Sequence, residues 1–422
     1  MDLQPGTFDV PLEKHTYGGD AMGRLPDGRA VFVPFGLPGE RVRLKLIEEK
    51  KNFARGEIIE ILDGSKDRIL PRCKHFGECG GCHYQNLLYE KQLESKTEIL
   101  RDQLTRIGKI ESPPVQPMVA CPNPWNYRNH IQFSLTQEGK LGFVSPLPRG
   151  EGLGVMASIL EITECHLPEP SINDFWPQLQ FEPGTDIERV SLRMGKDQDL
   201  LLVLESESPE PPDLEIEADI SVTHVYEENT VVIAGNDHIL IPVLDRVFKA
   251  SAPSFFQVNT VMAEKMVQHL IAQLPMTQSS TLIEIYCGVG LFSAFFASRC
   301  KNVIGIESSA SACEDFVVNL DEFDNVELYE GLAEDVLPNL VGRIANPPYL
   351  IVDPPRAGIE RHALDAIIQL RPQAIAYVSC GPSTLARDAK RLIEGGYILK
   401  QVTPFDLFPQ TYHIESISIF EQ

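Results

Sequence analysis

The sequence is poor in the features that mark membrane or exported proteins. No stretch approaches the roughly 18 uninterrupted apolar residues that a membrane span requires, although 43% of the 422 residues are hydrophobic. The first residues, MDLQPGTFDV, lack the basic segment and apolar run of an export signal. We therefore expect a cytoplasmic protein that has no membrane partner and has enough apolar residues for a substantial core.

Basic residues are also scarce. Lys and Arg total 37 against 60 Asp and Glu, which gives a net charge of -23 at pH 7. A uniformly acidic surface would repel a polyanion, since phosphate contacts need Lys or Arg. The basic residues are unevenly spread, however, because residues 205–228 and 302–342 hold none while residues 41–56 and 91–109 carry clusters. These clusters are either local faces for a nucleic acid or only solvated surface.

Cysteine is present at nine positions, and three of them lie close together. Cys73, Cys79 and Cys82 fall within CKHFGECGGC, where the glycines allow tight folding round a ligand. Three neighbouring thiolates suit a metal or an iron–sulfur centre, and the missing export signal argues against disulfides. The His spacing of zinc fingers is absent, although His75 and His83 lie next to the cysteines.

The order of predicted elements indicates a multidomain protein. Residues 1–62 alternate β-rich runs with Gly turns and predict a small, OB-like β-barrel. Residues 63–124 hold the cysteines and a helical pattern, and residues 125–250 form a β-rich or α+β central domain. Strands and helices alternate in residues 251–422, which predicts a Rossmann-like, largely parallel sheet with its ligand at the carboxyl ends of the strands.

A Gly loop in the C-terminal domain predicts a nucleoside site. EIYCGVG, residues 284–290, follows an apolar strand, and Glu307 ends the next strand 17 residues after Gly290. An acidic residue at that place can accept hydrogen bonds from ribose hydroxyls. The loop lacks the third Gly and any nearby basic residue, which favours S-adenosylmethionine over NAD. A tight packing turn is the simpler alternative for so short a motif.

Two further residues are candidates for catalysis. Cys380 ends an apolar strand in AIAYVSCGP, at the sheet edge where catalytic groups are displayed, but a free Cys is more often a buried apolar residue. Glu415 begins the last apolar strand, where a carboxylate costs free energy unless it is paired, functional or solvated.

Two similar tetrads lie on either side of the apolar run YLIV. Asn346-Pro347-Pro348-Tyr349 is typical of methyltransferases that modify an exocyclic amine, and Asp353-Pro354-Pro355-Arg356 suggests chemistry on a uracil ring. The run leads directly into Asp353, so we predict that Asp353 faces the cofactor and Asn346 does not.

Five motifs in order resemble the RNA uracil-C5-methyltransferase family. They are FFQVN at residues 255–259, EIYCGVG, DPPRAG, VSCGPSTLARD and FPQTYHIES. The N-terminal barrel looks like a TRAM domain, and CKHFGECGGCHYQ is similar to the four-iron, four-sulfur site of this family. The sequence departs from the usual pattern at Glu284, where Asp is common.

The resemblance implies roles for particular residues. Those that would bind S-adenosylmethionine or shape its pocket are Gln257, Tyr286, Glu307 and Asp353. Cys380 would be the nucleophile and Glu415 the base, and Arg128 is a candidate RNA contact. The ligands of a [4Fe-4S] cluster would be Cys73, Cys79, Cys82 and, as the distant fourth, Cys165, with Cys121 as its competitor.

The implied reaction is methylation of carbon 5 of a uridine in RNA. Addition of a thiolate at carbon 6 makes carbon 5 nucleophilic, and a base must later remove the proton of carbon 5. Members with both barrel and cluster most often resemble the 23S ribosomal RNA enzymes, so we expect that substrate, with transfer RNA as the alternative. An amino-methyltransferase and a non-catalytic iron–sulfur RNA-binding protein are remote alternatives, and a monomer is expected.

Overall fold

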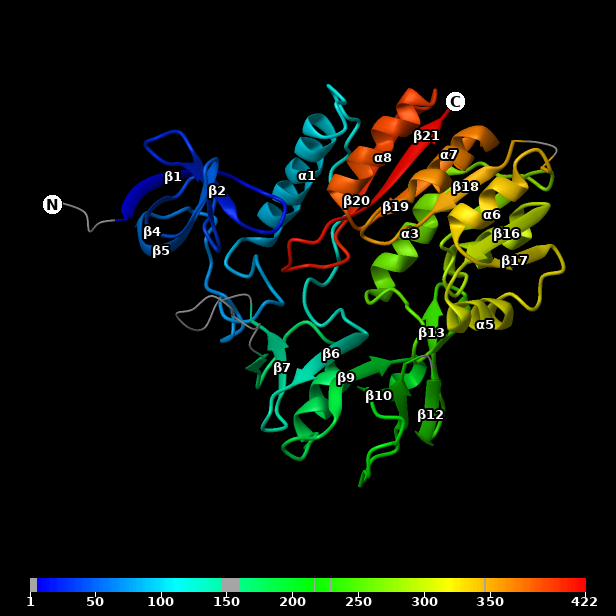
Figure 1. The fold of residues 1–422 in the computed structure, drawn as a ribbon, viewed down its shortest axis with the longest axis horizontal. Helices are drawn as coiled ribbons and strands as arrows, with labels where there is room; N and C mark the ends of the chain where they lie inside the picture. Colours follow the sequence, from blue (N-terminus) through cyan, green and yellow to red (C-terminus); the bar gives the residue numbers. More distant parts are fainter. Residues whose placement is uncertain (1–5, 146–158, 216, 228, 345–346) are drawn as a thin grey trace.

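The computed structural model describes residues 6–145, 159–215, 217–227, 229–344 and 347–422. Figure 1 shows three bodies: a small barrel in blue, a central sheet in green, and a larger sheet with helices in yellow to red. This arrangement confirms the multidomain fold predicted from the sequence. In the described ranges, no helix combines the length and the apolar character needed to cross a membrane.

The N-terminal body is a closed five-stranded barrel in which β4 pairs with β1 and with β5. Alternate residues point inward, so that Val10, Val31, Val42 and Leu44 are wholly buried. Its strands are β1 (Thr7–His15), β2 (Ala21–Arg24), β3 (Ala30–Val33), β4 (Arg41–Glu49) and β5 (Phe53–Asp63).

The central body is a seven-stranded sheet in the order β12-β11-β10-β9-β6-β7-β8. Its elements are β6 (His130–Leu135), β7 (Leu141–Val144), β8 (Ile159–Glu161), α2 (Pro170–Phe175), β9 (Ile187–Met194), β10 (Leu200–Ser206), β11 (Ser221–Tyr226) and β12 (Asn229–Ala234). A hairpin of β13 (His238–Val243) and β14 (Arg246–Ser251) follows. Ile241 and Phe248 of this hairpin belong to the same apolar core as Met262 and Met266, so the hairpin packs with the C-terminal body.

The C-terminal body is a seven-stranded sheet in the order β17-β16-β15-β18-β19-β21-β20. The first five strands are parallel, while β21 runs antiparallel to both β19 and β20. Its elements are α3 (Thr260–Gln273), β15 (Thr281–Ile285), α4 (Leu291–Phe296), β16 (Asn302–Glu307), α5 (Ala310–Asn319), β17 (Val326–Glu330), α6 (Ala333–Leu340), β18 (Tyr349–Val352), α7 (Arg361–Leu370), β19 (Ala374–Ser379), α8 (Pro382–Glu394), β20 (Ile398–Phe405) and β21 (Glu415–Glu421).

The region between the barrel and the central sheet covers one edge of the C-terminal sheet. Helix α1 (Tyr89–Arg106) packs beside α8, as Figure 1 shows in cyan and orange. The Pro-rich segment after α1 then pairs with the edge strand β20, through bridges that join Val115 to Val402 and Val119 to Phe405. This pairing satisfies an edge that would otherwise expose unpaired backbone groups.

One ion pair joins α1 to the segment that follows β20. The side chains of Lys96 and Asp406 are both wholly buried, and Nζ lies 2.6 Å from Oδ1. Lys96 also donates to the carbonyl of Phe408 at 3.0 Å, and the Tyr89 hydroxyl donates to the second carboxylate oxygen at 2.8 Å. Because the buried charges have partners, the pair can be kept in the core.

We expect that Lys96→Met lowers the free energy of unfolding by about 3–5 kcal/mol, because it leaves a buried carboxylate unpaired. Urea denaturation followed by circular dichroism measures this loss. Lys91 is the matched control on the same helix, since its side chain is 38% exposed and pairs with Glu94. Lys91→Met should cost no more than about 1 kcal/mol, and equal losses in the two variants would contradict the assignment.

Candidate active site

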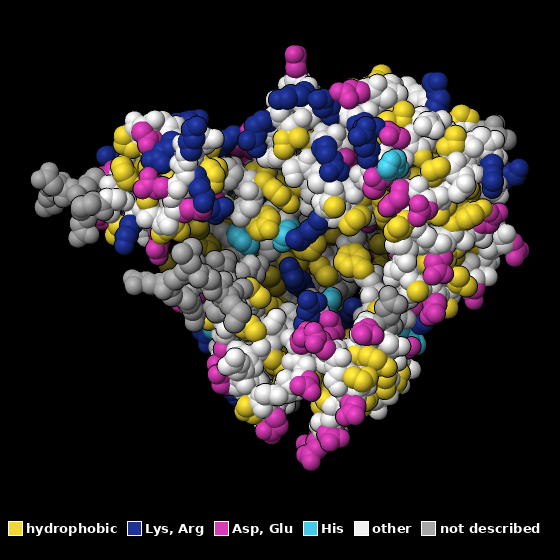
Figure 2. Space-filling model, viewed as in Figure 1, with side chains coloured by type: hydrophobic (Ala, Val, Ile, Leu, Met, Phe, Trp, Pro, Cys, Tyr) yellow, Lys and Arg dark blue, Asp and Glu magenta, His cyan; other side chains and the backbone are white. Residues whose placement is uncertain are grey.

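A cavity of about 1300 Å³ opens at the carboxyl ends of the parallel strands. Its lining includes all six residues that the sequence proposed for cofactor binding and catalysis: Gln257, Tyr286, Glu307, Asp353, Cys380 and Glu415. Figure 2 shows the hollow between the bodies, where apolar, basic and His side chains are visible. The topology explains the gathering, because the ends of parallel strands meet at one sheet edge.

The Gly loop after β15 makes a tight turn into α4. The backbone N–H groups of Tyr286 and Cys287 both donate to the carbonyl of Ile306, at 2.9 and 3.2 Å, which holds the loop against β16. Gly290 has a φ of 87°, and a Cβ at this position would lie 2.4 Å from Leu320 and 2.9 Å from Phe316. Only Gly fits here without displacing α5.

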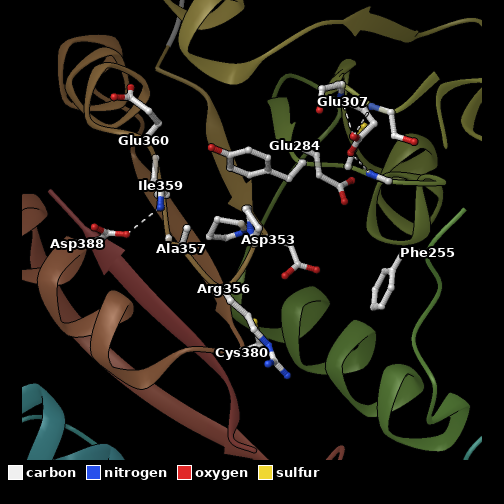
Figure 3. A pocket seen from close by; sticks show the side chains of 18 of the residues that line it. Phe255, Glu284, Glu307, Asp353, Arg356, Ala357, Ile359, Glu360, Cys380 and Asp388 are labelled. Atoms are coloured by element: carbon white, nitrogen blue, oxygen red, sulfur yellow. Dashed lines mark hydrogen bonds between the residues drawn. The ribbon is translucent and has the colours of Figure 1, made fainter. Parts of the chain in front are cut away.

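Glu307 ends β16 with its carboxylate held by the backbone. One oxygen accepts the N–H of Gly288 at 2.9 Å, and the other accepts those of Ser308 and Ser309 at 2.7 and 2.8 Å. These bonds, drawn as dashed lines in Figure 3, fix the direction of the carboxylate. A carboxylate has about four acceptor sites, so the group keeps capacity for a ligand hydroxyl.

Two acidic groups form the wall of the cavity next to β15 and β18. Figure 3 shows the carboxyl groups of Glu284 and Asp353 turned toward the same space. Burial raises the pKa of Asp353 to about 7. Burial also raises the pKa of Glu284 to about 8, and the charge of Asp353 adds to this effect. The Ser293 hydroxyl donates to the Glu284 carboxylate, so the longer side chain that replaces the usual Asp has a partner.

Cys380 and Glu415 meet through the pairing of β19 with β21. Ser379 lies opposite Ser416 in this antiparallel pair, so the next residues in register are Cys380 and Glu415. Burial raises the pKa of Cys380 to about 11, and the charges of Glu415 and Asp353 raise it further. Burial raises the pKa of Glu415, which is only 4% exposed, well above its usual range. A thiol and a carboxyl group therefore share one end of the cavity.

Arg356 is the cation that faces this pair, and the sequence assigned it no role. Its charge opposes the rise in pKa of both Cys380 and Glu415. Figure 3 shows its side chain beside Cys380. Its place in the tetrad that begins with Asp353 is the signal that could have identified it. Phe408 and His413, within the motif FPQTYHIES, also line the cavity.

Gln257 lies in a wall of the cavity that hydrogen bonds from the central body hold in place. The side-chain amide of Asn129 donates to the Gln257 carbonyl and to Thr260 Oγ1, both at 3.1 Å. Gln257 itself is 8% exposed, whereas Phe255 two residues earlier is 69% exposed and also lines the cavity. Sequence reasoning quoted Phe255 within FFQVN but gave this exposed aromatic ring no role.

The two tetrads lie at opposite ends of β18. Tyr349 begins the strand, is buried, and donates its hydroxyl to the Pro275 carbonyl at 3.3 Å, whereas Asp353 follows the last residue and lines the cavity. Asn346 falls outside the described residues. The described part of its tetrad, Pro347 to Tyr349, lies at the strand end away from the cavity.

The segments that carry the four cysteines proposed as cluster ligands lie side by side, since the Lys74 N–H donates to the Glu164 carboxylate at 2.8 Å and the Thr163 N–H to the His75 ring at 3.1 Å. Burial raises the pKa of Cys82 to about 12, and the charges of Cys165 and Cys79 add to this effect. Burial raises the pKa of Cys165 to about 11, and the charges of Cys79 and Cys73 raise it further. All four are free thiols. Within the described ranges, no three Cys, His, Asp or Glu side chains are arranged to hold a metal ion.

Cys121, the competitor for the fourth position, lies elsewhere. Its thiol donates to the Asn123 carbonyl at 3.1 Å and accepts from the Asn259 amide at 3.5 Å, next to the C-terminal body. Arg128, in contrast, lies near the cluster cysteines, since its charge lowers the pKa of both Cys82 and Cys165. Its guanidinium is 5.9 Å from the centre of the Phe408 ring. Arg128 is half-buried. It lies between these cysteines and the cavity, which Phe408 lines.

Comparison with known proteins agrees with this arrangement. The model of the tRNA (Uracil-5-)-methyltransferase family matches residues 229–422, and that of the TRAM domain matches residues 6–59. An uncharacterized RNA methyltransferase of Halalkalibacterium halodurans is 32% identical over 450 residues, which cover 98% of this chain and 96% of the relative. One of Aquifex aeolicus is 32% identical over 441 residues, 98% of each chain.

A solved structure shares the whole fold. The Pyrococcus abyssi tRNA (uracil-54, C5)-methyltransferase, determined in complex with S-adenosyl-L-homocysteine, aligns with a TM-score of 0.71 and 23% identity, over 97% of this chain and 99% of that one. The identity of 32% to the two RNA methyltransferases over 98% of this chain, together with both domain matches, shows that the chain belongs to the TRAM-containing family of S-adenosylmethionine-dependent RNA uracil-5-methyltransferases.

Proposed function

We propose that this enzyme methylates carbon 5 of a uridine in 23S ribosomal RNA, through a covalent adduct of Cys380 that Glu415 resolves. The observation that carries the proposal is the register of β19 and β21, which sets a thiol and a carboxyl group side by side in the cavity. The presence of both a TRAM barrel and a cysteine site favours ribosomal RNA. Transfer RNA is the second candidate, which the likeness to the Pyrococcus abyssi enzyme favours.

The reaction uses the two residues in sequence. The Cys380 thiolate adds to carbon 6 of uracil, and the electrons of the ring double bond move toward carbon 5 and the carbonyl oxygen. S-adenosylmethionine supplies the methyl group that carbon 5 takes, and S-adenosylhomocysteine leaves. Glu415 then removes the proton of carbon 5, its C–H electrons restore the double bond to carbon 6, and the bond from carbon 6 to Cys380 breaks.

The surroundings of the two residues suit these steps. Burial holds the pKa of Cys380 at about 11, and the positive charge of Arg356 opposes this rise, which favours the thiolate that adds to the ring. Burial raises the pKa of Glu415, so the ionised group binds the carbon 5 proton more strongly than an exposed carboxylate would. We assign cofactor binding to Gln257, Tyr286, Glu307 and Asp353, where the oriented carboxylate of Glu307 has capacity for a ribose hydroxyl. The target base must leave its stack to enter the cavity.

The other bodies would hold the RNA around this cavity. We propose that residues 1–62 and 125–250 bind RNA, that residues 63–124 link them, and that residues 251–422 catalyse the transfer. All six proposed catalytic and cofactor residues come from one chain, which supports a monomer. The enzyme would act in the cytoplasm, on RNA that is accessible there.

We also propose that Cys73, Cys79, Cys82 and Cys165 hold a [4Fe-4S] cluster. The support is their mutual closeness and their free state. The cluster would tie residues 73–82 to Cys165 of the central body, and a structural role fits because methyl transfer needs no electrons.

Methyl transfer can be measured with labelled S-adenosylmethionine and unmodified transcripts of 23S ribosomal RNA and transfer RNA. We expect label at carbon 5 of uridine in the ribosomal transcript. Cys380→Ser should abolish turnover, and Glu415→Gln should slow it by about 10²–10⁴-fold while a covalent protein–RNA complex accumulates. Cys300→Ser is the matched control, because this buried thiol lies outside the cavity and donates a hydrogen bond to the Phe296 carbonyl.

Each other outcome identifies a different function. Label confined to transfer RNA would support the second candidate substrate. Turnover that survives Cys380→Ser would support an amino-methyltransferase, and an absence of S-adenosylmethionine binding by calorimetry would support a non-catalytic RNA-binding protein.

The cluster predicts its own spectrum. Protein purified without oxygen should absorb broadly at about 400 nm, as iron bound to thiolates does. Cys165→Ser should lose iron and give less folded protein, whereas Cys121→Ser should retain both the iron and the absorption. Colourless protein with one zinc per chain, or loss of iron from the Cys121 variant alone, would refute the assignment.

A further inference from the structure

The segment of residues 406–414 leads directly into the proposed base. It joins β20 to β21 without regular secondary structure and ends where Glu415 begins β21. Its residues Phe408 and His413 line the cavity. Cys380 follows a different strand and lies before α8, outside this segment. A shift of the segment would therefore move Glu415 relative to Cys380.

Four consecutive carbonyls of this segment accept hydrogen bonds from distant parts of the chain. The Asn259 amide donates to Leu407 at 3.1 Å, Lys96 to Phe408 at 3.0 Å, and the Tyr127 hydroxyl to Pro409 at 3.0 Å. The backbone N–H groups of His83 and Tyr84 both donate to Gln410, at 2.8 and 3.0 Å. The donors come from the cysteine region, α1, the central body and the start of α3, and the ring of Tyr17, which lies between β1 and β2 of the barrel, packs against that of Tyr412 at 5.7 Å.

Helix α1 also contacts side chains of this segment. Besides the Lys96–Asp406 ion pair, Gln92 binds Gln410 twice: its amide donates to the Gln410 side chain at 3.0 Å, and its carbonyl oxygen accepts the Gln410 backbone N–H at 3.1 Å. Both Gln residues are at most 2% exposed. Neither Lys96 nor Gln92 lines the cavity, but both bond directly to the segment that ends at Glu415.

We propose that Lys96 and Gln92 are positioning residues that set the Glu415 carboxylate against the substrate ring. This inference rests on the proposed function, in which Glu415 removes the proton of carbon 5. It assigns α1 a part in one chemical step. Adduct formation and methyl transfer depend on Cys380 and the cofactor, whereas resolution of the methylated adduct depends on Glu415. Loss of the contacts should therefore slow resolution selectively.

The test uses the full-length enzyme and the RNA transcripts named above. Lys96→Met/Asp406→Asn removes both charges, so that neither is left buried and unpaired, and Gln92→Ala is a second variant that leaves the ion pair intact. We expect release of methylated RNA to slow by about 10–100-fold, as for a displaced catalytic group, while formation of the complex that resists denaturing gels stays within about twofold of wild type. Lys91→Met should behave as wild type.

Transcripts with 5-fluorouridine supply an independent readout, because fluorine at carbon 5 cannot leave as a proton would. Every variant competent for adduct formation should be trapped on them to the wild-type extent. Equal slowing of complex formation and of release in both positioning variants would show a merely structural role and overturn the proposal. If Glu415→Gln itself accumulates no complex, the proposed function fails. If it does accumulate complex and the positioning variants do not, only the present inference fails.

Discussion

The buried ion pair of Lys96 and Asp406 is the interaction on which the arrangement of the bodies around the cavity depends. Buried charges are tolerated only when all their hydrogen-bonding groups have partners. The Tyr89 hydroxyl donates to the Asp406 carboxylate, and the Phe408 carbonyl accepts from Lys96. One charge lies on α1 and the other on the segment that precedes Glu415. Helix α1 is therefore joined directly to the segment that leads to the proposed base, although the strands of the described residues form four separate sheets.

Strand pairing brings the proposed catalytic groups together. The parallel strands β15, β16, β18 and β19 end at one edge, which gathers Glu307, Asp353 and Cys380 there. The last strand, β21, enters antiparallel next to β19, so its first residue, Glu415, is placed at the same edge as the final residues of its neighbour. A parallel strand at that place would have put its first residue at the opposite edge of the sheet.

Burial also moderates the acidity of the cavity. Glu284, Asp353 and Glu415 all have raised pKa values, chiefly because burial disfavours their ionised forms. At neutral pH the cavity thus carries less negative charge than a count of its carboxyl groups suggests. Arg356 adds a positive charge at the same place. The cavity of a protein with a net charge of -23 can in this way carry less negative charge than its carboxyl groups would give it if they were exposed.

The sequence by itself determined the layout of the chain: Gly turns and short runs indicated a barrel, and alternating strands and helices indicated a parallel sheet whose loops carry Glu307, Asp353 and Cys380. These are local signals, namely the spacing of apolar residues and the residue types of turns, and they do not depend on how the rest of the chain packs. Only the tertiary structure decided the partners. It grouped Cys165 rather than Cys121 with the other cysteines, placed Arg356 beside Cys380, and joined Lys96 to Asp406 across 310 residues. Such contacts depend on how separate elements pack, and no local pattern encodes that packing.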